Sequence, residues 1–206
     1  EFRRVLFRSP KENQITKRWS GGTTTEICIF PKDSNYEDRN FIWRISSANV
    51  ESEESNFTYL KNIWREIMIL DGNIKLIHND ETSINLGKFE KHSFSGQWET
   101  RSYGKVTDFN LMVSEKANGN ISYIRLNEHT MSEFSLNIKN KRNHKNLYYG
   151  FYCYEGNIKV CLDNKSFTLN KNDFFLINLK KGFGSMSLIN ESDNTAHIVK
   201  VKIVYN

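Results

Sequence analysis

The chain has 206 residues, enough for one large all-β domain or for two small domains that share an interface. Hydrophobic residues make up 38% and charged residues 26% of the sequence, so the chain can bury a core and is not a disordered tail. The net charge is +5 at pH 7, but the basic residues are scattered and form no Arg-rich helix. A mixed, solvated surface is therefore expected, with no nucleic-acid partner.

The apolar runs, the N-terminal segment and the cysteines indicate where in the cell the protein is expected. No apolar run is long enough to span a bilayer, so no membrane partner is expected. Residues 1–10 are not a secretory signal, because arginines flank a run of only Val5-Leu6-Phe7. This run looks foreign, and residues 1–14 are expected to be a foreign or disordered segment. The odd set Cys28, Cys153 and Cys161 fits a reducing compartment, so a cytoplasmic location is expected.

Segments rich in β-branched and aromatic residues follow one another along the chain, separated by polar turns. The only plausible helical turn is Asn56–Lys61. The expected strands are Thr24–Phe30, Phe41–Val50, Thr107–Val113, Ile121–Leu126, Met131–Ile138, Ser166–Leu169, Asp173–Leu179 and His197–Val204. Short strands of this kind predict a sandwich, jelly roll or barrel.

Part of the sequence is repeated. Residues Ile67–Lys75, IMILDGNIK, return at Phe151–Lys159 as FYCYEGNIK, with the matching glycines 84 residues apart. A second pair, Leu86–Glu90 and Leu169–Asp173, follows at an offset of 83. Each Gly-Asn is expected to form the tight turn of a hairpin. Two matches in order indicate a duplication. The expected boundaries are a first half at residues 15–113, a linker at 114–120 and a second half at 121–206.

Three segments of the first half carry the candidate site. In residues 19–26, WSGGTTTE, the two glycines allow an unusual backbone path or the close approach of a ligand. In residues 41–48 and 107–113, one face of each strand is apolar, while the other carries charged, amide and hydroxyl groups. Arg65 shares a face with two isoleucines, so its guanidinium is expected to point inward. Such polar faces are typical of a pocket that orients a small polar ligand.

An inward arginine needs a carboxylate, and the sequence leaves two sources open. One is an internal salt bridge of Arg44 or Arg65 with Glu26 or Asp108. The other is a carboxylate on a bound ligand. A pair of arginines at one pocket would favour the ligand.

These segments resemble the HutD/Ves family of cupin-like proteins. The residues that carry the resemblance are Trp19, Gly21, Gly22, Thr24, Glu26, Trp43, Arg44, Ser46, Ala48, Val50, Arg65, Asp108, Phe109, Asn110 and Met112. The resemblance implies an all-β double-cupin fold, with two related jelly-roll or barrel halves and few or no helices. It also implies the binding of a small metabolite, linked in some members to control of histidine utilisation and in others to stress response.

Many cupins are metal enzymes whose signature places His-x-His and a Glu on one strand pair, with a later His. None of the five histidines of this chain forms His-x-His, and none lies in the three motifs. Isolated surface histidines are therefore expected, with no bound metal and no cofactor.

The sequence thus predicts a small-molecule binding protein whose ligand is a small anionic metabolite with a carboxylate, and it leaves open whether the protein is a homodimer. No catalytic residue is assigned. The expected ligand-binding residues are Trp19, Gly21, Gly22, Thr24, Glu26, Arg44, Ser46, Arg65, Asp108, Asn110 and Met112. The alternative is a metal-free isomerase or lyase that uses Glu26 or Asp108 as its base.

Overall fold

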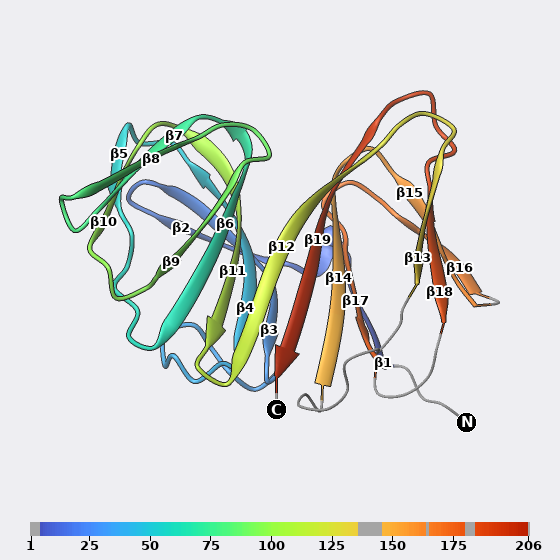
Figure 1. Cartoon of the computed structure of the whole chain (residues 1–206), viewed down its shortest axis with the longest axis horizontal. Coiled ribbons are helices and arrows are strands. Elements are labelled where there is room, and N and C mark those ends of the chain that lie inside the picture. The colour runs from blue at the N-terminus through green and yellow to red at the C-terminus, as the bar shows by residue number, and fades with distance from the viewer. Residues whose placement is uncertain (1–4, 136–145, 164, 180–183, 206) are drawn as a thin grey trace. The chain divides into compact units, whose positions relative to one another are not determined.

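The computed structural model describes residues 5–135, 146–163, 165–179 and 184–205, which form mainly antiparallel β-strands. It divides into two compact units: the N-terminal unit, Gln14–Ile121, and the C-terminal unit, Ser122–Asn206 together with Glu1–Asn13. Figure 1 shows strands throughout both units; the described residues also include one short 3-10 helix, η1, Lys11–Asn13. None of the described residues belongs to a helix long and apolar enough to cross a membrane.

The N-terminal unit contains a six-stranded sheet in the order β2-β3-β4-β11-β6-β9 and a four-stranded sheet in the order β5-β10-β7-β8. The strands are β2 (Ile15–Trp19), β3 (Gly22–Phe30), β4 (Trp43–Val50), β5 (Glu54–Asn56), β6 (Ile63–Gly72), β7 (Ile74–His78), β8 (Thr82–Leu86), β9 (Lys91–Ser95), β10 (Thr100–Tyr103) and β11 (Val106–Ser114). One apolar cluster joins the two sheets, with Ile67 and Ile69 of β6 packed in the same core as Leu76 of β7.

The C-terminal unit contains a five-stranded sheet in the order β1-β17-β14-β19-β12 and a four-stranded sheet in the order β13-β18-β15-β16. The strands are β1 (Val5–Ser9), β12 (Ala117–Leu126), β13 (Met131–Ser135), β14 (Asn146–Glu155), β15 (Ile158–Leu162), β16 (Lys165–Leu169), β17 (Phe174–Asn178), β18 (Ser185–Ile189) and β19 (Ala196–Tyr205). Its core is filled by large apolar side chains from both sheets, among them Phe151, Phe175 and Leu188.

The two units repeat one strand arrangement. The run β4-β11-β6-β9 of the first sheet returns as β12-β19-β14-β17, and β5-β10-β7-β8 returns as β13-β18-β15-β16. Eight consecutive strands, β4 to β11, therefore correspond to the next eight, β12 to β19. Strands β1, β2 and β3 lie outside this repeat. The expected fold class, two related jelly-roll-like halves of cupin type, is confirmed.

Individual hydrogen bonds are repeated as well. Phe89 N donates to Ile69 O at 2.6 Å, and Asn172 N donates to Cys153 O at 2.5 Å. Phe89 and Asn172 both have positive φ, 65° and 68°. The donors lie 83 residues apart and the acceptors 84, which are the two offsets found in the sequence.

The expected Gly-Asn hairpins are wrong. Gly72 and Gly156 do have positive φ, 82° and 81°, but at each the chain passes from one sheet to the other. The strand pairing shifts by one residue just before each glycine, at Leu70 and at Tyr154. A bulge of this kind bends a strand and increases its twist, which directs the chain onto the second sheet. Cys153 consequently pairs with Ile198 and not with the strand that follows it.

The expected helical turn at Asn56–Lys61 is also wrong. After β5 these residues have no regular structure. Their backbone bonds are long-range: Phe57 N donates to Thr100 O at 2.9 Å, and Leu60 N donates to Gly96 O at 2.7 Å. Tertiary hydrogen bonds and burial of Leu60 replace the local bonds of a helix.

Three further expectations concern segment ends. Residues 5–9, within the segment expected to be foreign or disordered, form β1 and pair with the edge of β17 because Val-Leu-Phe favours strands. Residues 114–120, the expected linker, are instead the end of β11, a turn and the start of β12. Of the expected strand Met131–Ile138, the first five residues form β13 and the rest lies outside the described residues.

Candidate functional site

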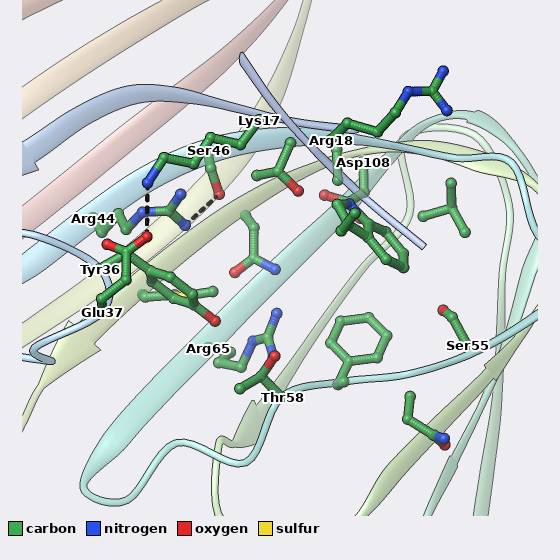
Figure 2. Close-up of a pocket in the computed structure, with 18 residues that line it drawn as sticks. Lys17, Arg18, Tyr36, Glu37, Arg44, Ser46, Ser55, Thr58, Arg65 and Asp108 are labelled. Carbon is green, nitrogen blue, oxygen red and sulfur yellow. Dashed lines mark hydrogen bonds and ion pairs between the residues drawn. The ribbon is translucent and has the colours of Figure 1, made fainter. Parts of the chain in front are cut away.

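The N-terminal unit contains a cavity of about 360 Å³, within the size range of small-molecule pockets. Figure 2 shows its lining as sticks. The lining residues are Lys17, Arg18, Trp19, Thr24, Tyr36, Glu37, Arg44, Ser46, Ala48, Val50, Ser55, Asn56, Phe57, Thr58, Arg65, Asp108, Asn110 and Met112.

Strand register brings five side chains of β4, β6 and β11 together on one face of the sheet, and these form the polar wall of the cavity. Met112 of β11 lies opposite Arg44 of β4 on one side and opposite Arg65 of β6 on the other. Two residues along, Asn110 lies opposite Ser46. Because side chains alternate between the faces of a sheet, these five residues point to one side. Among their neighbours in sequence, Trp43, Ile45 and Leu111 are buried apolar residues that take the opposite face.

Arg44 is paired with a carboxylate inside the protein. Its Nε donates to Glu26 Oε2 at 2.7 Å, and an Nη donates to Ser46 Oγ at 3.1 Å. The guanidinium also lies over the Tyr36 ring, 4.5 Å from its centroid. Of the two alternatives left open by the sequence, the internal salt bridge is therefore confirmed for Arg44.

Arg65 lacks such a partner. Its residue is 6% exposed, and its guanidinium lies over the rings of Phe57 and Phe94, at 4.5 and 5.3 Å from their centroids. Among the described residues no carboxylate forms an ion pair with it, and its Nε has no hydrogen-bond partner. Burial lowers the pKa of Arg65 to about 10, opposed by Tyr36 and Asp108. The guanidinium is still charged at neutral pH, so a buried positive charge faces the cavity without a counter-ion.

Asp108 and Asn110 add unsatisfied oxygen atoms to the same wall. Each residue is 4% exposed, and neither Oδ1 finds a hydrogen-bond donor among the described residues. Burial raises the pKa of the Asp108 carboxyl to about 7, although the charge of Arg65 and a hydrogen bond from the Ala48 backbone lower it. Buried polar atoms without partners are rare in folded proteins, and these two oxygens can accept hydrogen bonds from a molecule in the cavity.

Most of the residues expected from the sequence lie together. Eight of them line the cavity: Trp19, Thr24, Arg44, Ser46, Arg65, Asp108, Asn110 and Met112. The other three, Gly21, Gly22 and Glu26, do not line it. Glu26 acts through Arg44, and Gly21 leaves room for the Trp19 ring, since a Cβ there would lie 2.1 Å from Trp19 Cζ3. That these residues bind a ligand stays a prediction.

The rim of the cavity was not expected. Lys17 and Arg18 come from β2, Tyr36 and Glu37 from the β3–β4 loop, and residues 55–58 from the end of β5 and the coil after it. The charges of the rim are paired with each other: Lys17 Nζ lies 2.7 Å from Glu37 Oε1, as Figure 2 shows. Loops carry no alternation, so no sequence signal indicates which of their residues face inward, and β2 and β5 were not among the expected strands.

The lining does not fit a divalent metal. It offers one unpaired carboxyl group, Asp108, and sets a buried guanidinium, Arg65, beside it. No group of three or more His, Cys, Asp or Glu side chains is placed to hold a metal ion within the described part of the chain.

His78 and His92 form a partly buried pair, unlike the isolated surface histidines that were expected, and His197 is half-buried with its Nδ1 2.6 Å from Tyr123 Oη. His78 is 2% exposed, and its Nε2 lies 3.0 Å from His92 Nε2. The reason is that β7 and β9 direct both rings toward Phe94, on which His92 stacks and against which His78 is tilted by 39°. Neither histidine lines the cavity.

The polar wall has no counterpart in the C-terminal unit. By strand register, Tyr149 takes the place of Arg65, Ile198 that of Asp108 and Lys200 that of Asn110. Ile198 belongs to the apolar core of that unit. In the described residues the candidate site is therefore single, although the fold is duplicated.

Comparisons with known proteins agree with this fold. The family model HutD matches residues 11–195. A conserved protein of unknown function from Pseudomonas aeruginosa PAO1 superposes with a TM-score of 0.79 at 20% identity, over 97% of this chain and 98% of that chain. HutD from Pseudomonas fluorescens SBW25 gives 0.67 at 17% identity, over 96% and 98%. A variant of oxalate decarboxylase from Bacillus subtilis gives 0.67 at 8% identity, over 94% and 76%. No curated protein matches the sequence.

Proposed function

Because the chain belongs to the HutD family, we propose that its N-terminal unit binds a small metabolite through a carboxylate group. The observation that carries the proposal is Arg65, a buried guanidinium that lines the cavity without a carboxylate partner among the described residues. A planar guanidinium matches a carboxylate with two parallel hydrogen bonds. The role is binding and regulation, as the sequence resemblance implies for histidine utilisation or stress response.

The energetics support an anionic ligand. Burying an ion without a partner lowers the free energy of unfolding by roughly several kcal/mol, because the ion loses its hydration. Proteins rarely retain such an ion unless it serves a function. A carboxylate on Arg65 offsets that cost only when the ligand is bound. Arg44 contributes shape and hydrogen bonds but little net charge, since Glu26 already neutralises it.

A thermal-shift screen against small carboxylic acids, including those of histidine degradation, tests the proposal. Acids that bind raise the melting temperature of the wild-type protein. Arg65→Met removes the charge at similar volume and should weaken binding about 10-fold to 100-fold, as expected for a lost charge-assisted hydrogen-bond pair. Asn110→Ala should reduce the shift as well. Arg125→Met is the matched control, because Arg125 is exposed and lies in the C-terminal unit. Equal shifts in the wild type and in Arg65→Met would contradict the proposal.

One observation favours a second function, the metal-free isomerase or lyase. Glu26 is held by Arg44 at 2.7 Å and is not available as a base. Asp108 forms no ion pair among the described residues, and burial raises its pKa to about 7, where a general base works best near neutral pH. Incubating each binding acid with the protein in D₂O separates the two functions. Exchange of a carbon-bound proton that is lost in Asp108→Asn would support the enzyme, and unchanged ligand spectra support binding alone.

A further inference from the structure

We infer that the ligand carries a hydrogen-bond donor, an ammonium or hydroxyl group, in addition to its carboxylate, and that Asp108 and Asn110 bind this donor. The inference rests on the proposed function, because it assigns the second end of the same ligand. It concerns the chemical class of the ligand and does not depend on any pathway.

The first support is the position of the two acceptors. Asp108 and Asn110 are two residues apart on β11, so their side chains lie on the same face of the sheet. Both line the cavity, both are at least nine-tenths buried, and each has an Oδ1 without a donor among the described residues. A ligand with a carboxylate alone would leave both oxygens unsatisfied, because a carboxylate only accepts hydrogen bonds.

The second support is the separation of the unpaired charges. Arg65 lies opposite Met112, four residues along β11 from Asp108, so the two residues lie at different levels of the sheet, although the charge of each still acts on the pKa of the other. The two charged groups share the cavity but form no ion pair with each other. A ligand with an anionic end and a donor end can satisfy both groups by lying between them.

The third support is that the other charges around the cavity are already paired. Arg44 is bound to Glu26 at 2.7 Å, and Lys17 to Glu37 at the same distance. Arg18 has its partner too, Glu51 at 3.5 Å. The cation and the carboxyl that lack partners among the lining residues are therefore those of the inner wall, which fixes one anionic and one donating end for the ligand.

Three probe acids that differ at a single carbon test the inference: glutarate, L-glutamate and L-2-hydroxyglutarate. They carry hydrogen, ammonium and hydroxyl at that carbon, so they also separate a charged donor from a neutral one. Titration calorimetry at pH 8, where Asp108 is ionised, should show the two donor-bearing acids binding at least about 10-fold more tightly than glutarate.

Variants assign the donor site to its residue. In Asp108→Asn the preference for L-glutamate over glutarate should fall below about 3-fold, because the charge that the ammonium pairs with is gone. Asp71→Asn changes an exposed carboxylate that does not line the cavity and should keep the full preference. Melting temperatures of the unliganded variants show that each is folded.

The possible results have different consequences. Glutarate binding as tightly as the other two acids would overturn the inference and leave carboxylate binding intact. A full preference in folded Asp108→Asn would overturn the assignment to Asp108. If none of the three acids binds, the inference is wrong for this cavity, while the wider screen with Arg65→Met decides the proposed function separately.

Discussion

Arg44 and Arg65 look alike in the sequence but have opposite energetic roles in the fold. Arg44 is bound to Glu26, so its loss strands a carboxylate that is only 28% exposed. We expect Arg44→Met to lower the free energy of unfolding by about 1–2 kcal/mol, a value reduced by the partial exposure of Glu26. Arg65→Met removes an unpaired buried charge and places a thioether between Phe57 and Phe94, so it should be neutral or stabilising. Urea denaturation of the two unliganded variants provides the comparison, and equal destabilisation would show that Arg65 has a structural partner.

Asp108 makes stability depend on pH. Its pKa is raised from 3.8 to about 7 in the folded protein. Between pH 3.8 and pH 7 the Asp108 carboxyl is therefore protonated in the folded protein and ionised in the unfolded chain. The stability from this group is therefore complete below pH 3.8, falls as the pH rises, and is gone above pH 7. The advantage of Asp108→Asn over the wild type in free energy of unfolding should grow from pH 4 to pH 7, by at most about 1.4 kcal/mol per pH unit, and then level off. A difference that does not vary with pH between 4 and 8 would refute this.

The lining residues on the expected strands could be predicted from the sequence, and those on the loops and on the unexpected strands β2 and β5 could not. Alternation with Ile67 and Ile69 places Arg65 inside, and the structure confirms it at 6% exposure. Tyr36 and Phe57 line the same cavity but come from irregular segments, where no period fixes the direction of a side chain. Whether an inward arginine finds its carboxylate within the protein depends on register across three strands, which is a property of the fold and not of local sequence.

At the scale of elements, the adjacent residues Gly21, before β3, and Gly22, the first residue of β3, have different tasks. Gly22 has a φ of 153°, and a Cβ there would lie 2.0 Å from the backbone oxygen of Asn49. A Cβ on Gly21 would instead meet the far end of the Trp19 ring. We expect Gly22→Ala to destabilise the protein by about 2 kcal/mol or more, because backbone atoms cannot yield easily.

Gly21→Ala should affect ligand binding more than stability. The Trp19 side chain can rotate away, so the melting temperature should change little, but the cavity loses one wall. Thermal unfolding with and without a bound acid separates the two variants: a smaller ligand-induced shift is expected for Gly21→Ala. A fully retained shift would mean that Trp19 does not contact the ligand.

At the two bulges, the sequence predicts the turn glycine correctly but not the direction that the chain takes after it. The glycines of the repeated DGN and EGN segments do adopt positive φ, as turn chemistry requires. The extra residues at Leu70 and Tyr154 cannot be seen in the sequence, because a bulge depends on the strand alongside. One inserted residue converts a hairpin within a sheet into a corner between two sheets.

At the scale of the whole molecule, differences between the two copies of the repeat explain why the described residues hold one candidate site. Strands β2 and β3, which bring Trp19 and Thr24 to the cavity, lie outside the eight-strand repeat. Within the repeat, the polar positions of β6 and β11 are replaced in the C-terminal unit by Tyr149 and Ile198. An apolar core fills the interior there, so one copy of the fold supplies the cavity and the other has a packed core.

The histidine pair should make the N-terminal unit sensitive to acid. Thr100 Oγ1 donates to Trp98 O, so it accepts a hydrogen bond from His78 Nδ1. His78 Nε2 is then an acceptor for the Nε2–H of His92, at 3.0 Å. Burial lowers the pKa of both rings below 6.5, and His92 lowers that of His78 further. The unfolded chain binds protons first as the pH falls, so the stability from the pair is complete above pH 6.5 and is lost below it.

The tryptophans allow this loss to be measured in one unit. All four, Trp19, Trp43, Trp64 and Trp98, lie in the N-terminal unit, so tryptophan emission reports the unfolding of that unit alone. Between pH 7.5 and pH 5 the urea midpoint of the wild type should fall more than that of His92→Gln, whose amide can still donate to His78 but does not titrate. Asp108 is present in both proteins, so its own pH dependence cancels in the difference. Parallel falls in the two proteins would show that the pair does not control acid stability.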